Sequence, residues 1–274
     1  MEPTFVLLTD LSAAAEVASN YTSRLATLVG AQLVLLHVYQ DPLLEPEAAM
    51  MAVPAIAANR RQAMTELVER AQHLAVPAKA ELSIDSLGVA VANAVEQYHP
   101  LLLAVGREAP RTMLDRLVAN LALPVLRDAR YPLLVVPEAW PGASLPRRVV
   151  VAADDQGFWL TAPALALAPL LGALQPRTTV VHVAPGRGPS QASAGLQSVA
   201  RTGLFGQLSG NDLYEVREEA PVPGLLHATA ELGAELVVVV ARPHTLFGGM
   251  FHRSVTAELM RRSPVPVLVL PTMA

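Results

Sequence analysis

The sequence predicts an α/β protein built from two tandem, doubly wound, mostly parallel five-stranded sheets flanked by helices. Short apolar runs alternate with longer segments of helical periodicity, which is typical of parallel βαβ units. The pattern occurs twice, because a shift of 134 residues, from position 132 to position 266, places Pro132–Pro137 on Pro266–Pro271. A repeat of this length predicts two domains with one fold.

Length and composition fit this organisation. The chain has 274 residues, of which 52% are hydrophobic, and this length suits two domains. We divide it into a first domain at 1–138, a Pro- and Gly-containing linker at 139–146 and a second domain at 147–274. No apolar run reaches the roughly 18 residues of a membrane helix, and Met1–Phe5 lacks the pattern of a signal peptide. We therefore expect a cytoplasmic protein with no membrane partner.

Charge and cysteine content exclude several kinds of function. The chain has no cysteine, which excludes disulfides, thiolate metal sites and cysteine nucleophiles. The net charge is −4 and Lys79 is the only lysine, so we expect no nucleic-acid partner. Phosphate-binding P-loop and His-Glu-x-x-His motifs are absent, and the dinucleotide fingerprint is incomplete at Gly186–Gly188. The sequence therefore predicts no catalytic residue and no metal site.

The first half contains five predicted strands and several helices. The strands are expected at 5–8, 32–38, 78–84, 101–105 and 133–136. Ser12 is the expected N-cap of a helix that closes at Gly30. A long connection over 39–59 precedes a second helix, and a third helix is expected over 86–98. Asn120 is the expected N-cap of a later helix, because Pro124 then falls in its first turn.

The second half repeats this plan. Strands are expected at 147–154, 178–183, 214–217, 235–240 and 267–270. A long apolar helix over 160–174 is interrupted by Pro163 and Pro169, and another helix is expected over 223–232. The Gly- and Ser-rich stretch 185–210 is predicted to be the least ordered part.

The order of these motifs resembles the universal stress protein family in its tandem two-domain form. The resemblance spans nearly the whole chain, except for the connection after the second strand of each half. Its matching stretches are Val6–Ser12, Ala31–Val38, Leu101–Gly106, Pro132–Pro137, Val149–Asp154, Val180–Val183, Gly233–Val240 and Ser254–Pro271. It implies the strand order 3-2-1-4-5 and an edge-to-edge pairing of strands 133–136 and 267–270, which would join the halves as a pseudo-dimer.

The resemblance also implies where a nucleotide would bind. ATP-binding members carry an aspartate after strand one, which contacts adenine. They also carry a Gly-x-x-Gly loop after strand four, which nine intervening residues separate from Gly-Ser or Gly-Thr. Asp10 and Gly106 keep the first two features. Ala109 stands at the second glycine, and Ala119 and Asn120 stand at Gly-Ser. These five residues form the candidate ATP or AMP cleft of the first domain.

The same motif is more degenerate in the second half. Asp154 and Ser254 survive, but Val240, Pro243 and Arg253 replace the three glycines. Glycines let the backbone close around phosphates, and proline also removes an amide donor. Asp154 and Ser254 therefore mark a degenerate second cleft.

Each candidate also has a purely structural interpretation. Asp10 and Asp154 either contact adenine or cap the following helix, and capping is favoured. Asn120 and Ser254 are expected to act as N-caps rather than phosphate ligands. His37 and His182 end the second strand of each half, and we expect a packing role with one satisfied nitrogen.

The favoured function is a non-catalytic tandem universal stress protein that acts in the stress response through protein contacts or weak ligand sensing, with no cofactor. The alternative is ATP or AMP binding by the first domain, with slow ATP hydrolysis. A hydrolase or transferase on the same fold is a third option that no residue supports. Beyond the pseudo-dimer, a homodimer and further protein partners are left open.

Overall fold

A computed structural model describes residues 2–39, 46–108, 131–141, 144–184, 186, 190–217, 219–242 and 255–273. The strands are β1 (Thr4–Thr9), β2 (Gln32–Val38), β3 (Ala78–Ser83), β4 (Leu102–Arg107), β5 (Leu133–Pro137), β6 (Arg148–Ala152), β7 (Arg177–Ala184), β8 (Leu213–Arg217), β9 (Leu236–Ala241) and β10 (Val267–Pro271). The helices are α1 (Ala13–Leu28), α2 (Pro46–Gln72), α3 (Leu87–Tyr98), α6 (Ala162–Leu165), α7 (Ala168–Leu174), α8 (Ala192–Arg201), the 3-10 turn η1 (Gly210–Asp212), α9 (Pro221–Glu231) and α11 (Val255–Arg262).

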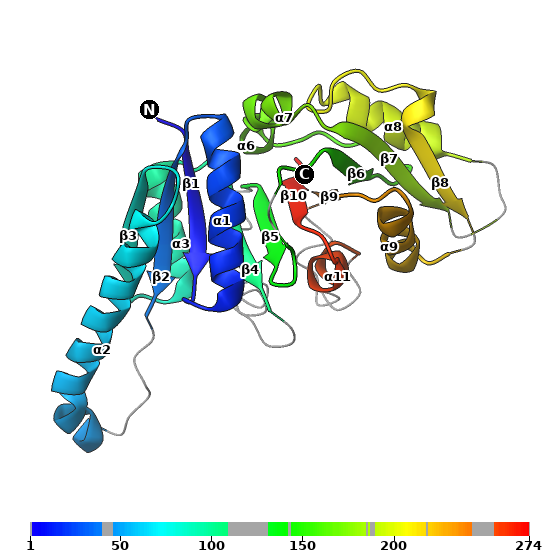
Figure 1. Cartoon of the computed structure of the whole chain (residues 1–274). Helices are drawn as coiled ribbons and strands as arrows, with labels where there is room; N and C mark the ends of the chain where they lie inside the picture. Colours follow the sequence, from blue (N-terminus) through cyan, green and yellow to red (C-terminus); the bar gives the residue numbers. More distant parts are fainter. Residues whose placement is uncertain are drawn as a thin grey trace.

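The strands of both domains form one ten-stranded sheet (Figure 1), in the order β3-β2-β1-β4-β5-β10-β9-β6-β7-β8. Each domain thus has the expected order 3-2-1-4-5, and its strands run parallel. The domains meet where β5 and β10 pair antiparallel, with Val267 opposite Val135 and Val269 opposite Leu133. This confirms the predicted edge-to-edge pairing.

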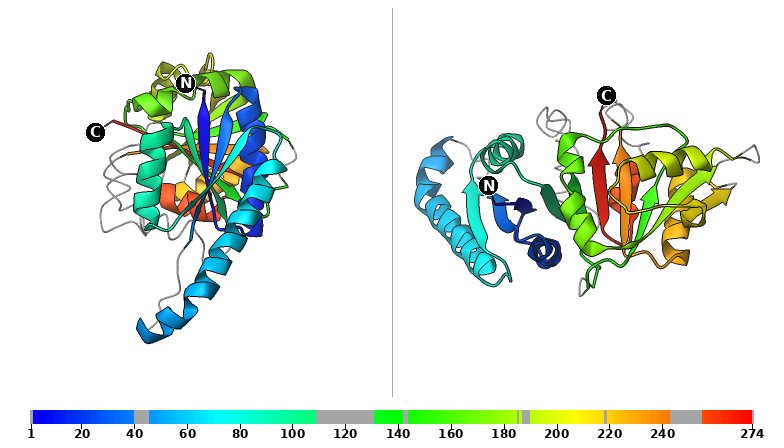
Figure 2. Two further views of the ribbon diagram at one scale, coloured as in Figure 1. Left: turned by 90° about the vertical axis from the view of Figure 1, so that its left-hand side faces the viewer. Right: turned by 90° about the horizontal axis from the view of Figure 1, so that it is seen from above.

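The core consists of two apolar layers, one on each face of the sheet, and each layer continues through both domains. Helices α3, α9 and α11 cover one face, and α1, α7 and α8 cover the other (Figure 2). Parallel strands covered on both faces must be apolar on both faces. This explains why the strand sequences are continuous apolar runs rather than alternating ones.

Helix starts follow the capping residues of the sequence. Ser12 Oγ accepts a hydrogen bond from Ala15 N–H at 3.2 Å at the start of α1, as predicted. Ser86 caps α3 in the same way. Thr161 caps α6, where its Oγ1 accepts from Ala164 N–H at 3.4 Å.

Two predictions for the second domain are wrong. The single helix over 160–174 is two short helices, α6 and α7, because Pro163 and Pro169 lie in first turns, where proline is tolerated. Leu160 instead forms a β-bridge with Thr272. The stretch 185–210 contains the ordered helix α8, whose Ser198 and Val199 are buried.

The predicted connection over 39–59 is also wrong, because α2 begins at Pro46 and contains Pro54 in its interior. Leu67 and Ala71 are buried, whereas the side chains at 53–66 are exposed or half-buried. The first half of α2 projects from the body of the molecule (Figure 1), so no core contact imposes a helical apolar pattern there. None of the described helices combines the length and apolarity needed to cross a membrane.

Candidate functional site

The candidate residues lie where parallel strands end. In the first domain Asp10 follows β1 and Gly106 lies near the end of β4, and these two strands are neighbours. In the second domain Asp154 follows β6 and Val240 lies near the end of β9, and these two strands also pair. Open α/β sheets bind ligands at this edge, where the strand order reverses.

Asp10 belongs to a tight loop between β1 and α1. Its Oδ1 accepts a hydrogen bond from Ser12 N–H at 3.1 Å, while Ser12 itself caps the helix. The interpretation of Asp10 as the helix cap is therefore wrong, and its carboxylate forms an Asx turn. Leu11 adopts a left-handed φ of 65°, and its carbonyl accepts from Arg70 Nη2 at 2.5 Å. Arg70 of α2 thus braces a strained loop and leaves the Asp10 side chain exposed.

Gly106 is required by the packing of α1. A Cβ at this position would lie 2.3 Å from the Ala14 carbonyl oxygen and 2.7 Å from the Ala15 nitrogen. Both atoms belong to the backbone, so no rotamer change could relieve the clash. Close approach of a helix therefore accounts for this glycine independently of any phosphate.

The matching aspartate of the second domain is held by an arginine. Arg242 follows β9 and forms an ion pair with Asp154 through Nη2–Oδ1 at 2.8 Å, and its Nε lies 3.3 Å from Oδ2. The same guanidinium donates to the Gln156 and Gly157 carbonyls at 2.9 and 3.1 Å. Asp154 Oδ1 also accepts from Gln156 N–H at 3.0 Å, whereas Thr161 caps α6. Helix capping is wrong for Asp154 as well.

Arg242 thereby fastens the loop after β6 to the end of β9. Planar guanidinium groups bind carboxylates through two parallel contacts, which fixes their geometry. The first domain has Glu108 at the corresponding position, 134 residues earlier, and an acidic residue cannot make this contact. The two strand-end sites therefore differ in charge as well as in their glycines.

Several predicted site residues lie outside the described part of the chain. They are Ala109, Ala119, Asn120, Pro243, Arg253 and Ser254. Among the described residues the structure brings together Asp10 with Gly106 and Asp154 with Val240 at neighbouring strand ends.

The two histidines have the predicted packing role. His37 Nδ1 lies 2.8 Å from the Thr9 carbonyl, and His182 Nδ1 lies 3.1 Å from the Ala153 carbonyl. Each ring thus ties the end of the second strand to the end of the first strand of its domain. No group of three or more metal-ligating side chains occurs among the described residues.

Sequence reasoning missed Arg107, which links the domains beside the first-domain site. Its Nη1 donates to the Arg261 carbonyl, and its Nη2 donates to the Ser263 carbonyl at 2.6 Å. These carbonyls lie at the end of α11, where helices leave acceptors unpaired. Burial lowers the pKa of Arg107, and its buried Nε has no hydrogen-bond partner among the described residues. The only local signal was an arginine next to Gly106.

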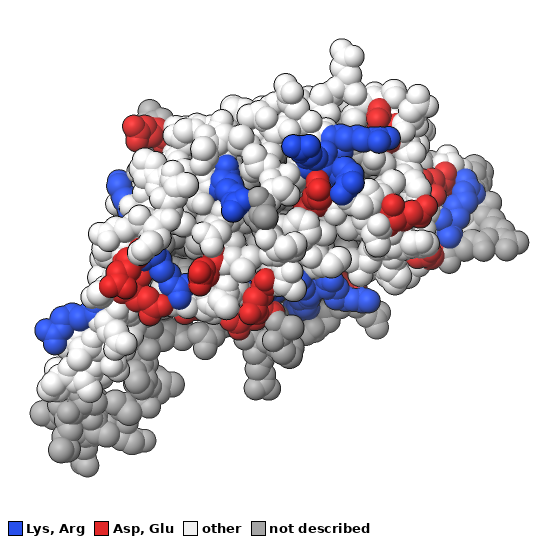
Figure 3. Space-filling view, in the orientation of Figure 1, with Lys and Arg blue, Asp and Glu red and all other residues white. Residues whose placement is uncertain are grey.

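Charges of both signs are interspersed over the face shown in Figure 3. An acidic cluster lies between α1 and α2, where Glu16, Glu66 and Glu69 line a groove of about 260 Å³ together with Arg70. This mixed surface agrees with the small net charge of −4.

The model of the universal stress protein family matches this chain twice, over residues 3–137 and over residues 146–271. A comparison with curated protein sequences gave no match. Among solved structures, a universal stress protein from Archaeoglobus fulgidus DSM 4304 is similar, with a TM-score of 0.64 and 18% identity over 98% of this chain and 96% of that one.

Two further solved structures share the fold at similar coverage. One is a putative universal stress protein from Pseudomonas aeruginosa UCBPP-PA14, with a TM-score of 0.56 and 16% identity over 99% of this chain and 94% of that one. The other is the cytoplasmic domain of a prokaryotic cation chloride cotransporter, with a TM-score of 0.52 and 14% identity over 98% and 95%. Together with the two family matches, the duplicated sheet shows that this chain belongs to the universal stress protein family, in its tandem two-domain form.

Proposed function

We propose that this chain is a non-catalytic, cytoplasmic member of its family that acts in the stress response through protein contacts and does not use a nucleotide cofactor. The observation that carries the proposal is the contact between Arg242 and Asp154. It engages, within the chain, the carboxylate that would otherwise contact adenine. Two domains with unlike strand-end sites then serve mainly to present surfaces.

In the second domain, a nucleotide would have to displace Arg242 from four oxygen atoms. These are both carboxylate oxygens of Asp154 and the carbonyls of Gln156 and Gly157. Charge-assisted hydrogen bonds are the stronger kind, and the guanidinium is already oriented by several of them. Val240 adds a side chain where the nucleotide-binding pattern has its first glycine.

In the first domain, the two surviving features have structural explanations. Gly106 makes room for α1, and Asp10 closes an Asx turn. Glu108 adds a second acidic residue at the end of β4, next to the strand that leads to Asp10. Two carboxylates near one strand-end site oppose a phosphate-bearing ligand unless a cation accompanies it.

The test is titration of the whole chain with ATP and Mg²⁺ by calorimetry, together with thermal melting in millimolar ATP. We expect no binding heat, no rise in the melting temperature and no phosphate release above the buffer rate. Binding of ligand to the native state must raise the melting temperature. An unchanged melting temperature therefore excludes a dissociation constant well below the ATP concentration used.

Adenine-nucleotide binding by the first domain is the second candidate, because the Asp10 carboxylate is exposed and forms no ion pair with another described residue. Saturable ATP binding that Asp10→Ala abolishes and Asp154→Ala leaves intact would establish this candidate. It would also overturn the non-nucleotide proposal. The Asp154→Ala variant is the matched control, because it removes the corresponding carboxylate from the other domain.

A further inference from the structure

The outer edge of β3 is open among the described residues, because β3 ends the sheet. Leu33 N–H donates to the Pro77 carbonyl at 2.9 Å, and Tyr39 N–H donates to the Ser83 carbonyl at 2.8 Å. In a parallel ladder these bonds alternate along the strand, so the backbone groups of Ala78, Ala80 and Leu82 point away from β2. A row of such groups is a template for another strand.

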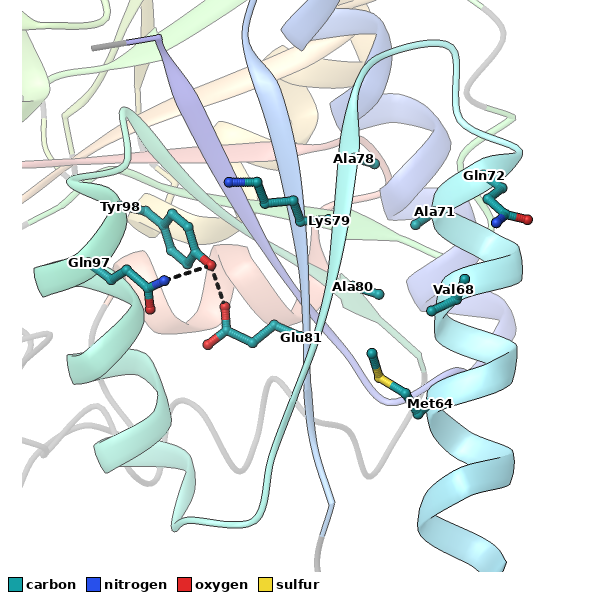
Figure 4. A pocket seen from close by; sticks show the side chains of 10 residues that line it. All are labelled: Met64, Val68, Ala71, Gln72, Ala78, Lys79, Ala80, Glu81, Gln97 and Tyr98. Atoms are coloured by element: carbon teal, nitrogen blue, oxygen red, sulfur yellow. Dashed lines mark hydrogen bonds between the residues drawn. The ribbon is translucent and has the colours of Figure 1, made fainter.

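The edge forms the floor of a groove of about 590 Å³. Met64 and Val68 of α2 line one wall, and Gln97 and Tyr98 of α3 line the other (Figure 4). Figure 4 shows Ala78 and Ala80 on the α2 side of the strand, and Lys79 and Glu81 directed toward Tyr98. The groove is thus apolar on one side and charged on the other, as the alternation of a strand requires.

We propose that the occupant of this groove is β3 of a second copy of the chain, paired antiparallel about a two-fold axis at Ala80. The strand is self-complementary in this arrangement. Lys79 lies opposite Glu81 of the second copy, and Glu81 lies opposite its Lys79. On the other side of the strand, Ala80 meets Ala80, and Ala78 meets Leu82.

The charges select this register. Shifting the two-fold axis to Lys79 or to Glu81 would place like charges directly opposite each other, which is destabilising. With the axis at Ala80, the outward backbone groups of Ala78, Ala80 and Leu82 form the hydrogen-bonded pairs. Lys79 and Glu81 then form the non-hydrogen-bonded pairs, in which side chains approach most closely.

Both charged side chains are already held in place on the α3 side. Tyr98 donates its hydroxyl hydrogen to Glu81 Oε2 at 2.8 Å, and the Lys79 ammonium lies 5.7 Å from the centre of the Tyr98 ring. Side chains that are already ordered lose less conformational entropy on binding than free ones, which favours the pairing of the two copies.

The same pairing would also cover apolar side chains of α2. Met64 is 37% exposed and Val68 is half-buried, and both face the groove. A two-fold axis perpendicular to the sheet keeps α2 of both copies on the same face, on either side of the joint. The chain already uses an antiparallel edge joint of this kind between β5 and β10.

The test is the mass of the whole chain by light scattering and sedimentation over a concentration series. We expect a dimer of twice 29.1 kDa. Lys79→Glu should raise the dimer dissociation constant about tenfold or more, because two attractive cross-strand pairs become repulsive. Glu81→Lys should act in the same direction, and the double variant Lys79→Glu/Glu81→Lys should restore dimerisation.

Two further variants test whether the dimer forms through the β3 edge. Ala80→Pro removes an outward N–H, which an edge strand tolerates, and should give a folded monomer. Arg217→Glu makes the same charge change on β8, the opposite edge strand, and should leave the dimer intact. A monomeric wild-type chain would overturn the proposal, even if it bound an extended peptide at β3. So would a dimer that survives Lys79→Glu and Ala80→Pro, or one that responds equally to Arg217→Glu.

Discussion

The two domains share one fold but differ in how their strand ends are closed. In the first domain α1 lies directly against Gly106, and Asp10 remains exposed beside it. In the second domain Val240 replaces the glycine, and Arg242 closes the site through an ion pair with Asp154. The same strand-end region of a duplicated fold is thus shaped by helix packing in one copy and by an ion pair in the other.

The largest expected effect comes from exchanging the two residues that distinguish the sites. Gly106→Val should lower the free energy of unfolding by about 3 kcal/mol or more, because its Cβ would meet the α1 backbone. Val240→Gly should cost about 1–2 kcal/mol, from lost packing and added chain entropy. Urea unfolding measures both.

The control for that exchange is Gly172→Ala in α7, where a new Cβ has no heavy atom within 4 Å. This change should be neutral or stabilising by up to about 1 kcal/mol, since alanine favours helix. If Gly106→Val were no more damaging than Val240→Gly, the packing account of the first-domain site would be refuted.

The next effect concerns the residue after Gly106. It is Arg107 in the first domain, and Ala241 stands at the matching position in the second. Arg107→Ala should lower stability by about 1–2 kcal/mol, because two carbonyls at the end of α11 lose a charged donor. Hydrogen exchange should accelerate in α11 more than in α9. Arg107→Lys should recover part of the loss, whereas unchanged exchange in α11 would show that the contact does not hold the helix.

A smaller effect is expected from Arg242→Ala. The Asp154 side chain is 52% exposed, so the ion pair should contribute about 0.5–1 kcal/mol, and less at high salt. Glu108→Arg tests the converse, the transfer of the closure to the first domain. If Glu108→Arg raises stability and Asp10→Ala removes that gain, the new arginine contacts Asp10. If the effects of Glu108→Arg and Asp10→Ala on the free energy of unfolding simply add, it does not.

The smallest effect is expected at a Tyr–Glu hydrogen bond that occurs in both domains. The tyrosine lies on a helix in the first domain and on a strand in the second. Tyr98 of α3 donates to Glu81 of β3, whereas Tyr214 of β8 donates to Glu231 of α9. Burial and Glu81 raise the pKa of Tyr98 from 10.0 to about 12. The folded state therefore favours the neutral phenol, and this stabilisation is complete below pH 10 and is lost as the pH rises toward 12.

Tyr98→Phe should lower stability by about 0.5 kcal/mol at pH 8, because the phenol is only partly buried, and by progressively less between pH 10 and 12. Chemical unfolding at several pH values measures this difference, and Tyr214→Phe is the matched change in the second domain. A Tyr98→Phe effect that is constant across that pH range would contradict the assigned hydrogen bond.

Much of the fold could be predicted because local patterns determine it. The strands are buried on both faces, so each is an apolar run, and Ser12 is a local capping signal. The joint between β5 and β10 was predicted from the family resemblance, together with the need to cover an apolar edge. Helix α2 was predicted, but its start over 46–59 was missed. The side chains from residue 53 onward project from the body, so packing imposes no apolar pattern on that part.

The candidate sites were less predictable, because their contacts join residues far apart in the chain. Arg242 meets Asp154 at a separation of 88 residues, and Arg107 meets the end of α11 at 154 and 156 residues. Neither pair leaves a local motif. Alignment of the two halves does place Arg242 opposite Glu108, and that change of charge was the one available hint.

The β5–β10 joint has a consequence for how the two halves can evolve. Because both strands belong to one chain, each domain experiences its partner at an effective concentration on the order of millimolar, whatever the abundance of the protein in the cell. The second domain therefore keeps its partner without any requirement to bind a ligand or to recognise a separate subunit. The strand-end positions of the second domain are free to accept substitutions, including an internal arginine, without loss of the assembly.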